Sequence, residues 1–243
     1  LEKIAFILPK PEKAVNLHDF YEAMETVSGK GIIMITDYMD YSLAYACGMR
    51  ELMIKYLRDR KFVYELLTIL QEHALETLRL YLEAGAKHIF TSGFAWGVGA
   101  GWSPKMFSEI FAPLIRERTS LLKSYAAVHH YYDDGTVMPI LKQLEDCGIR
   151  VLSTLAPPPF ADNNLAKAKK EVGNQMCLWG NIDLWNVIRN GTPELITTTV
   201  RKAIEDAGYS GGYILGSSDG LTEDTPIRSL MAFIAAGKKY GGY

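Results

Sequence analysis

The sequence contains few cysteines and no long apolar run. Only Cys47, Cys147 and Cys177 occur among 243 residues, and no two of them have CxxC spacing. This pattern argues against a disulfide framework and against a metal site made of cysteine alone, so we expect a reducing compartment. No apolar segment reaches the roughly 18 residues of a membrane helix, and the N-terminus lacks the pattern of a signal peptide. We therefore expect a cytoplasmic protein that does not associate with membranes.

The sequence also lacks an excess of positive charge. Its 26 basic and 28 acidic residues give a formal net charge of -2. No overall field then attracts nucleic-acid phosphates, so we expect a small-molecule substrate and no nucleic-acid partner. A hydrophobic content of 48% with 22% charged residues is typical of a globular chain.

Short β-rich runs recur along the chain, and each is followed by a segment with helical periodicity. The longest predicted helix covers Arg50 to Ala84, where apolar residues recur every three or four positions. A hydroxyl residue before proline predicts three further helix starts, at Ser103, Thr192 and Thr225. The predicted strands are Lys3–Leu8, Gly31–Thr36, Lys87–Thr91, Ala127–Tyr132, Ile149–Leu155, Met176–Gly180 and Gly212–Gly216.

Alternating strands and helices predict parallel strands joined by right-handed crossovers. The chain lacks a glycine fingerprint after its first predicted strand, and Gly97–Gly101 comes too late and with the wrong spacing for a dinucleotide-binding loop. A chain of this length favours a TIM-type (β/α)8 barrel over an open doubly wound sheet. No linker separates a second domain, so we expect one barrel domain over residues 1–243.

In a barrel of this kind the active site lies at the carboxyl ends of the strands. Polar or aromatic residues follow nearly every predicted strand, and each of them is also a common cap, turn or packing residue. We expect the tryptophans as a group to pack rather than to stack on a ligand, with Trp96 as the candidate exception. The predicted substrate-binding residues are Asp37, Trp96, His129, Asn181, Asp183 and Ser218.

The densest ionisable cluster is the run AVHHYYDDG, residues 127–135. Because strand side chains alternate, His130, Tyr132 and Asp134 share one face, and residues 129, 131 and 133 share the other. An imidazole, a phenol and a carboxylate on one face can ligate a metal, relay a proton or orient a substrate. The alternative is a plain turn, since Asp-Asp-Gly is a good turn signal.

Six segments in this order resemble the uroporphyrinogen decarboxylase superfamily: SPKMFSEIFAPLI, HHYYDDG, LEDCGIRVLSTLAPPP, LAKAKKEVG, LWGNIDLWNVIRNGTPELI and YILGSSDGLTEDTPIRSLMAFIAAGKKYG. The superfamily includes the decarboxylase and zinc-dependent methyltransferases that move methyl groups between corrinoids and thiols or other acceptors. The resemblance covers Gly31 to Tyr243. It implies a (β/α) barrel, a homodimer and further N-terminal strands, which we expect this chain to lack.

The chain departs from both family patterns at the residues that carry the chemistry. The resemblance places Asp219 where the decarboxylase has a histidine before the glycine of the last strand's loop. It places Tyr132, Asp134 and Asp219 where the methyltransferases have a histidine and two cysteines. No thiolate remains, and carboxylates with one imidazole form a harder metal site than thiolates do.

The resemblance implies three alternative functions. The first is a corrinoid-dependent methyltransferase that binds zinc or another divalent metal through His130, Asp134 and Asp219, with Tyr132, Asp134 and Asp219 as catalytic residues. A corrinoid-binding protein would then carry the methylcorrinoid to a small acceptor. The second is a decarboxylase or lyase acting without a cofactor on a tetrapyrrole such as uroporphyrinogen. The third is a barrel that binds a ligand without catalysis.

Overall fold

The computed structural model describes residues 1–37, 44, 46 and 48–242. These residues form two compact units. The first unit comprises Leu1–Gly93 and Glu109–His130, and the second comprises Phe94–Ser108 and Tyr131–Tyr243. The boundary falls inside one strand, between His130 and Tyr131. The prediction of a single domain stays a prediction.

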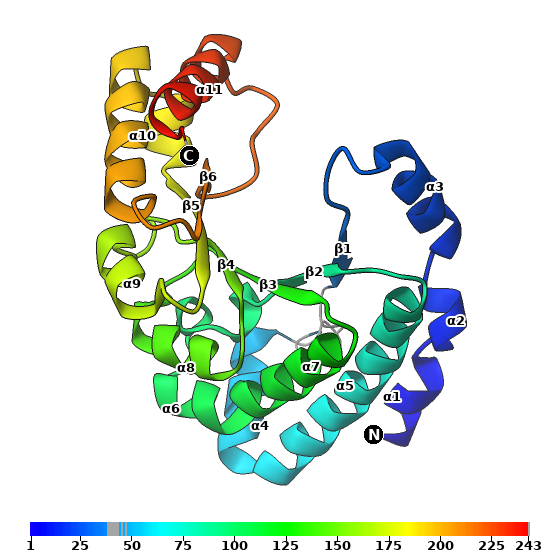
Figure 1. The fold of residues 1–243 in the computed structure, drawn as a ribbon. Coiled ribbons are helices and arrows are strands. Elements are labelled where there is room, and N and C mark those ends of the chain that lie inside the picture. The colour runs from blue at the N-terminus through cyan, green and yellow to red at the C-terminus, as the bar shows by residue number, and fades with distance from the viewer. Residues whose placement is uncertain (38–43, 45, 47, 243) are drawn as a thin grey trace. The chain divides into compact units, whose positions relative to one another are not determined.

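Six parallel strands alternate with helices and follow one another across the sheet in chain order (Figure 1). This is the α/β arrangement of a TIM-type barrel, as the alternation in the sequence predicts. Each observed strand corresponds to a predicted one. The observed and predicted first residues differ by at most three positions, and the last residues differ by at most two. The strands are β1 (Met34–Asp37), β2 (His88–Ser92), β3 (Val128–Asp133), β4 (Val151–Thr154), β5 (Cys177–Ile182) and β6 (Tyr213–Ser217).

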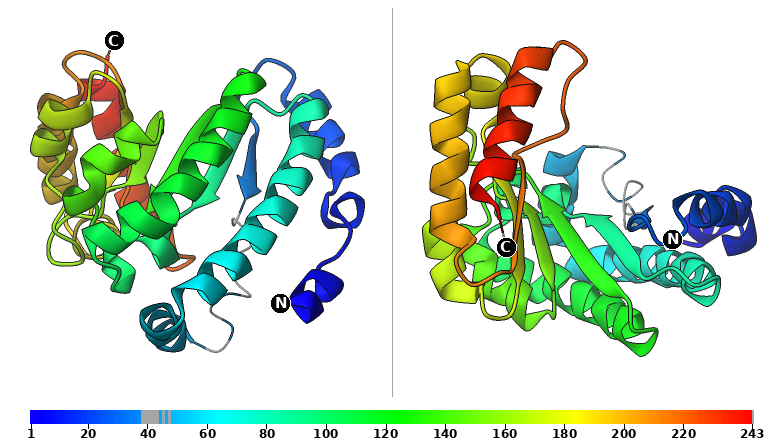
Figure 2. Two further views of the ribbon diagram at one scale, coloured as in Figure 1. Left: turned by 90° about the horizontal axis from the view of Figure 1, so that it is seen from below. Right: turned by 45° about the horizontal axis from the view of Figure 1, so that its top comes forward.

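The first unit holds β1, β2 and the start of β3. In it β1 and β2 pair in parallel, with Asp37 opposite Thr91. The long helices α5 and α7 lie side by side, as Figure 2 shows. Its helices are α1 (Glu2–Ile7), α2 (Pro11–Ala14), α3 (Leu17–Val27), α4 (Met49–Arg58), α5 (Arg60–Glu83) and α7 (Ala112–Ser124).

The prediction of a strand at Lys3–Leu8 is wrong, because these residues form helix α1 and its C-terminal end. A short apolar run without alternation does not distinguish a strand from a helix. Phe6 is 89% exposed and Ile7 is also exposed, so this run does not have the burial of a central strand.

The prediction of one helix from Arg50 to Ala84 is also wrong, because the helix is interrupted at Asp59. Asp59 has the non-helical dihedral angles φ -152° and ψ 75°, and its Oδ1 accepts a hydrogen bond from the Phe62 amide (3.2 Å). An aspartate in this position is a good N-cap, and the apolar periodicity does not reveal the break. Helices α4 and α5 therefore meet at a cap that the spacing of apolar residues hides.

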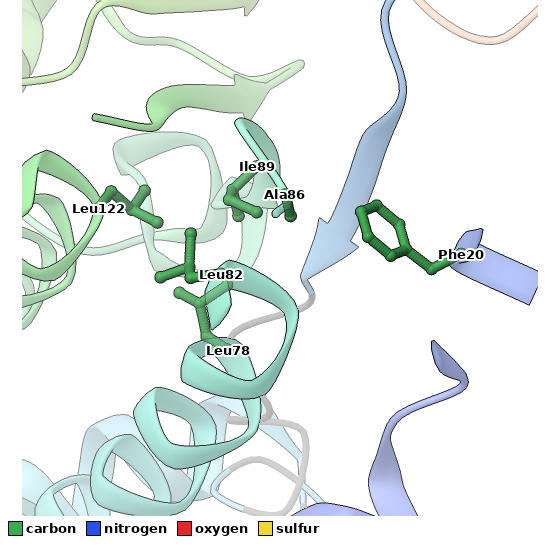
Figure 3. Packing of buried hydrophobic residues seen from close by; sticks show 6 residues of the cluster. All are labelled: Phe20, Leu78, Leu82, Ala86, Ile89 and Leu122. Carbon is green, nitrogen blue, oxygen red and sulfur yellow. The ribbon is translucent and has the colours of Figure 1, made fainter. Parts of the chain in front are cut away.

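The core of the first unit gathers around the C-terminal half of α5. Leu78 and Leu82 of α5 pack with Phe20 of α3 and Ile89 of β2 (Figure 3). Ala86 and Leu122 complete this buried cluster. These residues come from four separate elements, so their burial fixes α3 and α7 against the strands of the unit.

The second unit holds the rest of β3 and strands β4, β5 and β6, with β4–β5 and β5–β6 paired in parallel. Helices α10 and α11 pack against each other (Figure 1). Its helices are α6 (Pro104–Met106), α8 (Leu141–Asp146), α9 (Leu165–Val172), α10 (Pro193–Ala207) and α11 (Ile227–Tyr240). Its shorter helical segments are η2 (Phe94–Trp96), η3 (Val98–Ala100), η5 (Met138–Ile140) and η6 (Leu184–Arg189), and η4 (Phe107–Phe111) crosses the unit boundary.

Two of the three predicted hydroxyl caps are confirmed. Ser103 accepts a hydrogen bond from the Met106 amide, and Thr192 accepts one from the Leu195 amide (both 3.2 Å). The prediction that Thr225 caps the last helix is wrong, because α11 begins one residue later, with Pro226 at the N-cap position and no side-chain cap. Thr225 instead lies 3.1 Å from the hydroxyl of Thr222 in the preceding turn.

Two of the three cysteines lie in the described part of the chain. Cys147 is buried and Cys177 is partly buried. Cys47 lies outside the described residues. Among the described helices, none combines the length and the apolar character needed to span a bilayer.

The cap of α10 yields a stability prediction. Replacing Thr192 with alanine leaves the first-turn amide of Leu195 without its acceptor, so the free energy of unfolding should fall by about 1 kcal/mol. Urea unfolding followed by circular dichroism measures this change. The Thr192→Ser variant keeps the hydroxyl and serves as the control. Equal losses for both variants would show that the hydroxyl is not the stabilising group.

Candidate functional site

Three side chains predicted to be catalytic meet in the second unit. The phenol of Tyr132, on β3, lies 3.2 Å from Asp219 Oδ1 and 3.4 Å from Asp134 Oδ2. Asp134 directly follows β3 and Asp219 follows β6, so the two carboxylates come from loops at the carboxyl ends of two strands. The structure thus brings together residues that are 87 positions apart in the chain, from Tyr132 to Asp219.

The phenol of Tyr132 stays protonated in this setting. Burial raises its pKa above the ordinary value of 10.0, and the charges of Asp134 and Asp219 raise it further. One phenolic proton can be donated fully to only one carboxylate at a time. The second carboxylate therefore has acceptor capacity left for a ligand.

The two carboxylates have no basic partner in the part of the chain that the structure describes. Among the described residues, no lysine or arginine forms an ion pair with Asp134 or Asp219. Asp219 Oδ1 additionally accepts a hydrogen bond from the Gly220 amide (2.6 Å), and the Ser217 hydroxyl donates to the Asp219 carbonyl (2.6 Å). The site therefore concentrates negative charge, which a cation can neutralise.

A buried turn holds Asp134 in place. Asp133 Oδ1 accepts a hydrogen bond from the Gly135 amide (2.8 Å), which closes a turn around Asp134. The buried Asn163 fastens the same turn: its Nδ2 donates to the Gly135 carbonyl (2.9 Å), and its Oδ1 accepts from the Val137 amide (3.0 Å). The side chains of Asp133 and Asn163 thus hold the turn that carries Asp134.

Asp133 itself is fully buried on the opposite face of β3 from Tyr132. Its Oδ2 has no hydrogen-bond partner among the described residues and lies against the backbone of Gly97, where a methyl group would overlap it. Burial raises the pKa of Asp133 to about 7, and the neighbouring charge of Asp134 adds to the shift. The structure tolerates this carboxyl group only because residue 97 has no side chain.

Three predicted substrate-binding residues have structural partners in the second unit. Asp183 caps η6, with Oδ1 accepting from the amides of Trp185 (2.8 Å) and Asn186 (2.9 Å). Buried Ser218 accepts a hydrogen bond from the Leu184 amide (3.1 Å). Asn181 has a left-handed backbone (φ 82°) and donates to the Leu155 carbonyl (2.6 Å). Their roles in substrate binding stay predictions, and these contacts alone account for their positions.

A pocket of about 450 Å³ lies beside two of these residues. It is lined by Asn181 and Asp183 and by residues of α10, including Lys202 and Asp206. Lys202 Nζ contacts both oxygens of Asp206 (2.7 and 2.9 Å), so these two charges offset each other. The carboxylate of Asp183 accepts hydrogen bonds from the amides of Trp185 and Asn186 and from the side-chain amide of Asn186. The charged side chains of this pocket therefore already have partners within the chain.

Asp37 lies in the first unit, at the end of β1, where it is ion-paired with Arg118 of α7. The Arg118 side chain is fully buried, and burial lowers its pKa to about 9, so it stays charged at neutral pH. A buried guanidinium depends strongly on its carboxylate partner. The contact of Asp37 is thus that of a structural ion pair, and its role in substrate binding stays a prediction.

The two histidines of the run also lie in the first unit. His129 is buried, with its ring nitrogens 2.9 Å from the hydroxyls of Thr91 and Thr119, which is the environment of a core histidine. His130 is 6% exposed, and its Nε2 lies 3.0 Å from Nδ1 of His88. Burial lowers the pKa of His130 to about 4, and the charge of His88 contributes to this shift. His88 is a partner that the sequence analysis missed.

Trp96, in the second unit, is buried at 2% exposure, so its indole packs in the interior. This agrees with the expectation for the tryptophans as a group and gives no support to its role in substrate binding. Trp102 is likewise buried, and its Nε1 donates to the Ala95 carbonyl (3.1 Å).

The donor atoms around Asp134 and Asp219 are oxygens. In the second unit they are carboxylate oxygens and the phenol of Tyr132, whereas zinc is usually held by nitrogen and sulfur. These oxygens fit a hard cation better than a thiolate-type zinc centre. The set of His130, Asp134 and Asp219 stays a prediction.

A second group of candidate metal ligands lies on α3. Within the part of the chain that the structure describes, one group of three such side chains has ligand atoms within 4.8 Å of one another: His18, Asp19 and Glu22, all exposed on α3. Exposed acidic groups of this kind are common without a bound ion.

Parallel strands in chain order, with an acidic cluster at their carboxyl ends, define an α/β enzyme fold of the TIM-barrel class. The chain belongs to the uroporphyrinogen decarboxylase family: the family model described as "Uroporphyrinogen decarboxylase (URO-D)" matches residues 42–240. The resemblance drawn from the sequence motifs is thus confirmed. Members of this family are enzymes, either methyltransferases or decarboxylases.

The relatives include both activities. A methylated-thiol--coenzyme M methyltransferase from Methanosarcina mazei is 26% identical over 137 residues, which is 56% of this chain and 34% of that protein. A uroporphyrinogen decarboxylase from Pseudoalteromonas translucida is 25% identical over 177 residues, 70% of this chain and 46% of that protein. The chain therefore spans about a third to a half of these curated relatives.

A solved structure gives the same fold. The structure titled "methyltransferase from Methanosarcina mazei" matches with a TM-score of 0.75 and 20% identity, covering 90% of this chain and 62% of that one. At this identity the match supports the fold and not the reaction.

The buried carboxyl group of Asp133 yields a pH prediction. Its pKa of about 7 in the folded protein lies above its ordinary value of 3.8, so between these values the folded state binds more protons than the unfolded state. The free energy of unfolding should therefore fall as pH rises from about 4 to 7 and level off above that.

The Asp133→Asn variant keeps the size of the side chain and removes this titration. Its stability relative to the original protein should increase across the same pH range, as measured by urea unfolding at several pH values. A pH-independent difference between the two proteins would show that Asp133 is not the titrating group. The exposed Asp162→Asn substitution is the matched control and should show no such trend.

Proposed function

We propose that this chain carries the reactive centre of a corrinoid-dependent methyltransferase. In this proposal Tyr132, Asp134 and Asp219 bind a small molecule, and a separate corrinoid-binding protein exchanges the methyl group with it. The observation that carries the proposal is the pair of carboxylates around one phenol, with no lysine or arginine of the described residues ion-paired to Asp134 or Asp219.

The charge of this site favours methyl transfer over decarboxylation of a tetrapyrrole acid. Uroporphyrinogen carries several acidic side chains, and two unneutralised carboxylates would repel them. A neutral or cationic small molecule meets no such repulsion. The similarity to a methyltransferase named for methylated thiols agrees with this choice.

Each residue of the cluster has a distinct task. Tyr132 keeps its proton and donates a hydrogen bond, so it holds one carboxylate in position. The other carboxylate is left to accept a proton or an N–H group from the bound molecule. Asp133 and Asn163 act behind the site by fixing the turn that carries Asp134.

A methylcorrinoid would supply the methyl group, or receive it, on the partner protein. The chain's own residues would bind and orient the small molecule and exclude water from it. The oxygen donors of the second unit do not match a thiolate-type zinc centre.

Substituting the carboxylates tests the proposal. Asp134→Asn and Asp219→Asn should each lower the rate of methyl exchange with methylcobalamin by about a hundredfold or more, because each removes an acceptor from the site. The rate is followed by the visible absorbance of the corrinoid, with small methylated thiols, alcohols and amines as candidate partners.

Asp162→Asn, at an exposed aspartate of the same unit, is the control and should keep the original rate. Melting temperatures of all variants separate loss of activity from loss of folding. Unchanged rates in both site variants, in folded proteins, would disprove the assigned centre. Metal analysis of protein purified without chelator tests the predicted divalent ion separately.

The second candidate is a decarboxylase, which the several relatives named uroporphyrinogen decarboxylase favour. In that reaction Asp134 and Asp219 would accept hydrogen bonds from pyrrole N–H groups. Release of CO2 from uroporphyrinogen by the protein, without methyl exchange, would select this function.

A further inference from the structure

The inner face of β5 and β6 carries an aromatic ring that the sequence analysis assigned to packing. Leu178 and Ile182 of β5 are fully buried, so the alternate residue Trp179, which is partly exposed, points to the opposite face. In β6 the side chain of Leu215 faces α11, since a Cβ on Gly237 would lie 2.9 Å from it. Gly216, the next residue, therefore faces the same way as Trp179.

The absence of a side chain at Gly216 leaves room for the indole of Trp179. A Cβ on Gly216 would lie 2.5 Å from Trp179 Nε1 and 2.7 Å from its Cδ1, closer than real contacts of this kind. The indole therefore lies across β6 at a position that only glycine leaves open. Any larger residue at 216 would push the ring away from the strand.

Trp179 and Asp219 belong to neighbouring parts of the sheet, since β5 pairs with β6 and Asp219 follows β6. Its neighbours across the strands are Ser153 of β4 and Ile214 of β6. Gly216, which the ring covers, precedes Asp219 by three residues, and Asp219 contacts Tyr132. The aromatic ring and the two carboxylates therefore belong to the same unit, with the ring lying across β6 three residues before Asp219.

The indole N–H of Trp179 has no acceptor among the described residues. The same unit thus offers an aromatic ring, an open N–H donor and two carboxylates without a basic partner. Aromatic rings together with negative charge are the groups that bind methylated ammonium ions, whose positive charge is spread over apolar methyl groups.

We propose that Trp179, Asp134 and Asp219 bind a small methylated ammonium compound, with Trp179 as the residue that selects it. This inference rests on the proposed function, because it names the substrate class of the same site. The carboxylates neutralise the charge of the ligand, and the indole contacts its methyl groups. The thiolates of a zinc site have no task in this recognition, which accounts for the oxygen donors at these positions.

Binding of choline by isothermal titration calorimetry tests the inference without any corrinoid. The comparison ligand is the carbon isostere of choline, in which a quaternary carbon replaces the nitrogen and removes only the charge. Choline should bind, and its neutral isostere should bind at least about tenfold more weakly. Equal binding of the two ligands, or no binding of choline, overturns the inference.

Substitutions locate the site. Trp179→Leu should weaken choline binding about tenfold, and Trp179→Phe, which keeps a ring, should recover part of the loss. Asp134→Asn and Asp219→Asn should also weaken it. Trp185→Leu, at a partly exposed tryptophan of the same unit, is the control and should leave binding unchanged, and melting temperatures show which variants fold. Choline binding that is unaffected by Trp179→Leu overturns the inference.

Two further outcomes separate this inference from the proposed function. If choline binds through Trp179 but no methyl exchange with a corrinoid occurs for any partner, the ligand assignment stands and the methyltransferase proposal is wrong. If methyl exchange occurs with thiols or alcohols and choline does not bind, the ligand assignment alone is wrong. Tight binding of Mg²⁺ or Zn²⁺ that depends on Asp134 and Asp219, without choline binding, would also overturn it in favour of a metal site.

Discussion

The proximity of two carboxylates to one protonated phenol is the constraint on which the candidate site depends. Like charges repel each other, and the hydroxyl of Tyr132, within hydrogen-bond reach of both Asp134 and Asp219, offsets part of that repulsion. The turn closed by Asp133 and fastened by Asn163 holds one carboxylate there, and the loop after β6 holds the other. Buried parts of the structure therefore hold two like charges in an electrostatically unfavourable arrangement. Such arrangements are common at functional sites.

Much of the architecture follows from local patterns in the sequence. Six of the seven predicted strands are present, because buried parallel strands are short apolar runs bounded by turns and helices. The failures occur where such a pattern is ambiguous. The run Lys3–Leu8 is too short to separate strand from helix, and the stop at Asp59 depends on a single side-chain cap inside an otherwise continuous periodicity.

The site was accessible to sequence reasoning only in part. Alternation along β3 correctly separates Tyr132 from Asp133, and the rule that active sites lie at strand ends points to Asp219. The contacts of the other candidates could not be predicted in this way, because their partners come from other helices and strands. Asp37 pairs with Arg118, His130 contacts His88, and His129 contacts Thr119. A polar residue after a strand is equally compatible with catalysis, capping and burial, and only its contacts distinguish these roles.

The contact between Trp179 and Gly216 has a consequence for how such a site could change during evolution. Every missense mutation in the codon of Gly216 adds at least a Cβ atom, so one nucleotide change would displace the indole to which we assign ligand selection. Reversion would restore it in one step. On that assignment, ligand preference changes without rebuilding the barrel, since it depends on the missing side chain of one residue.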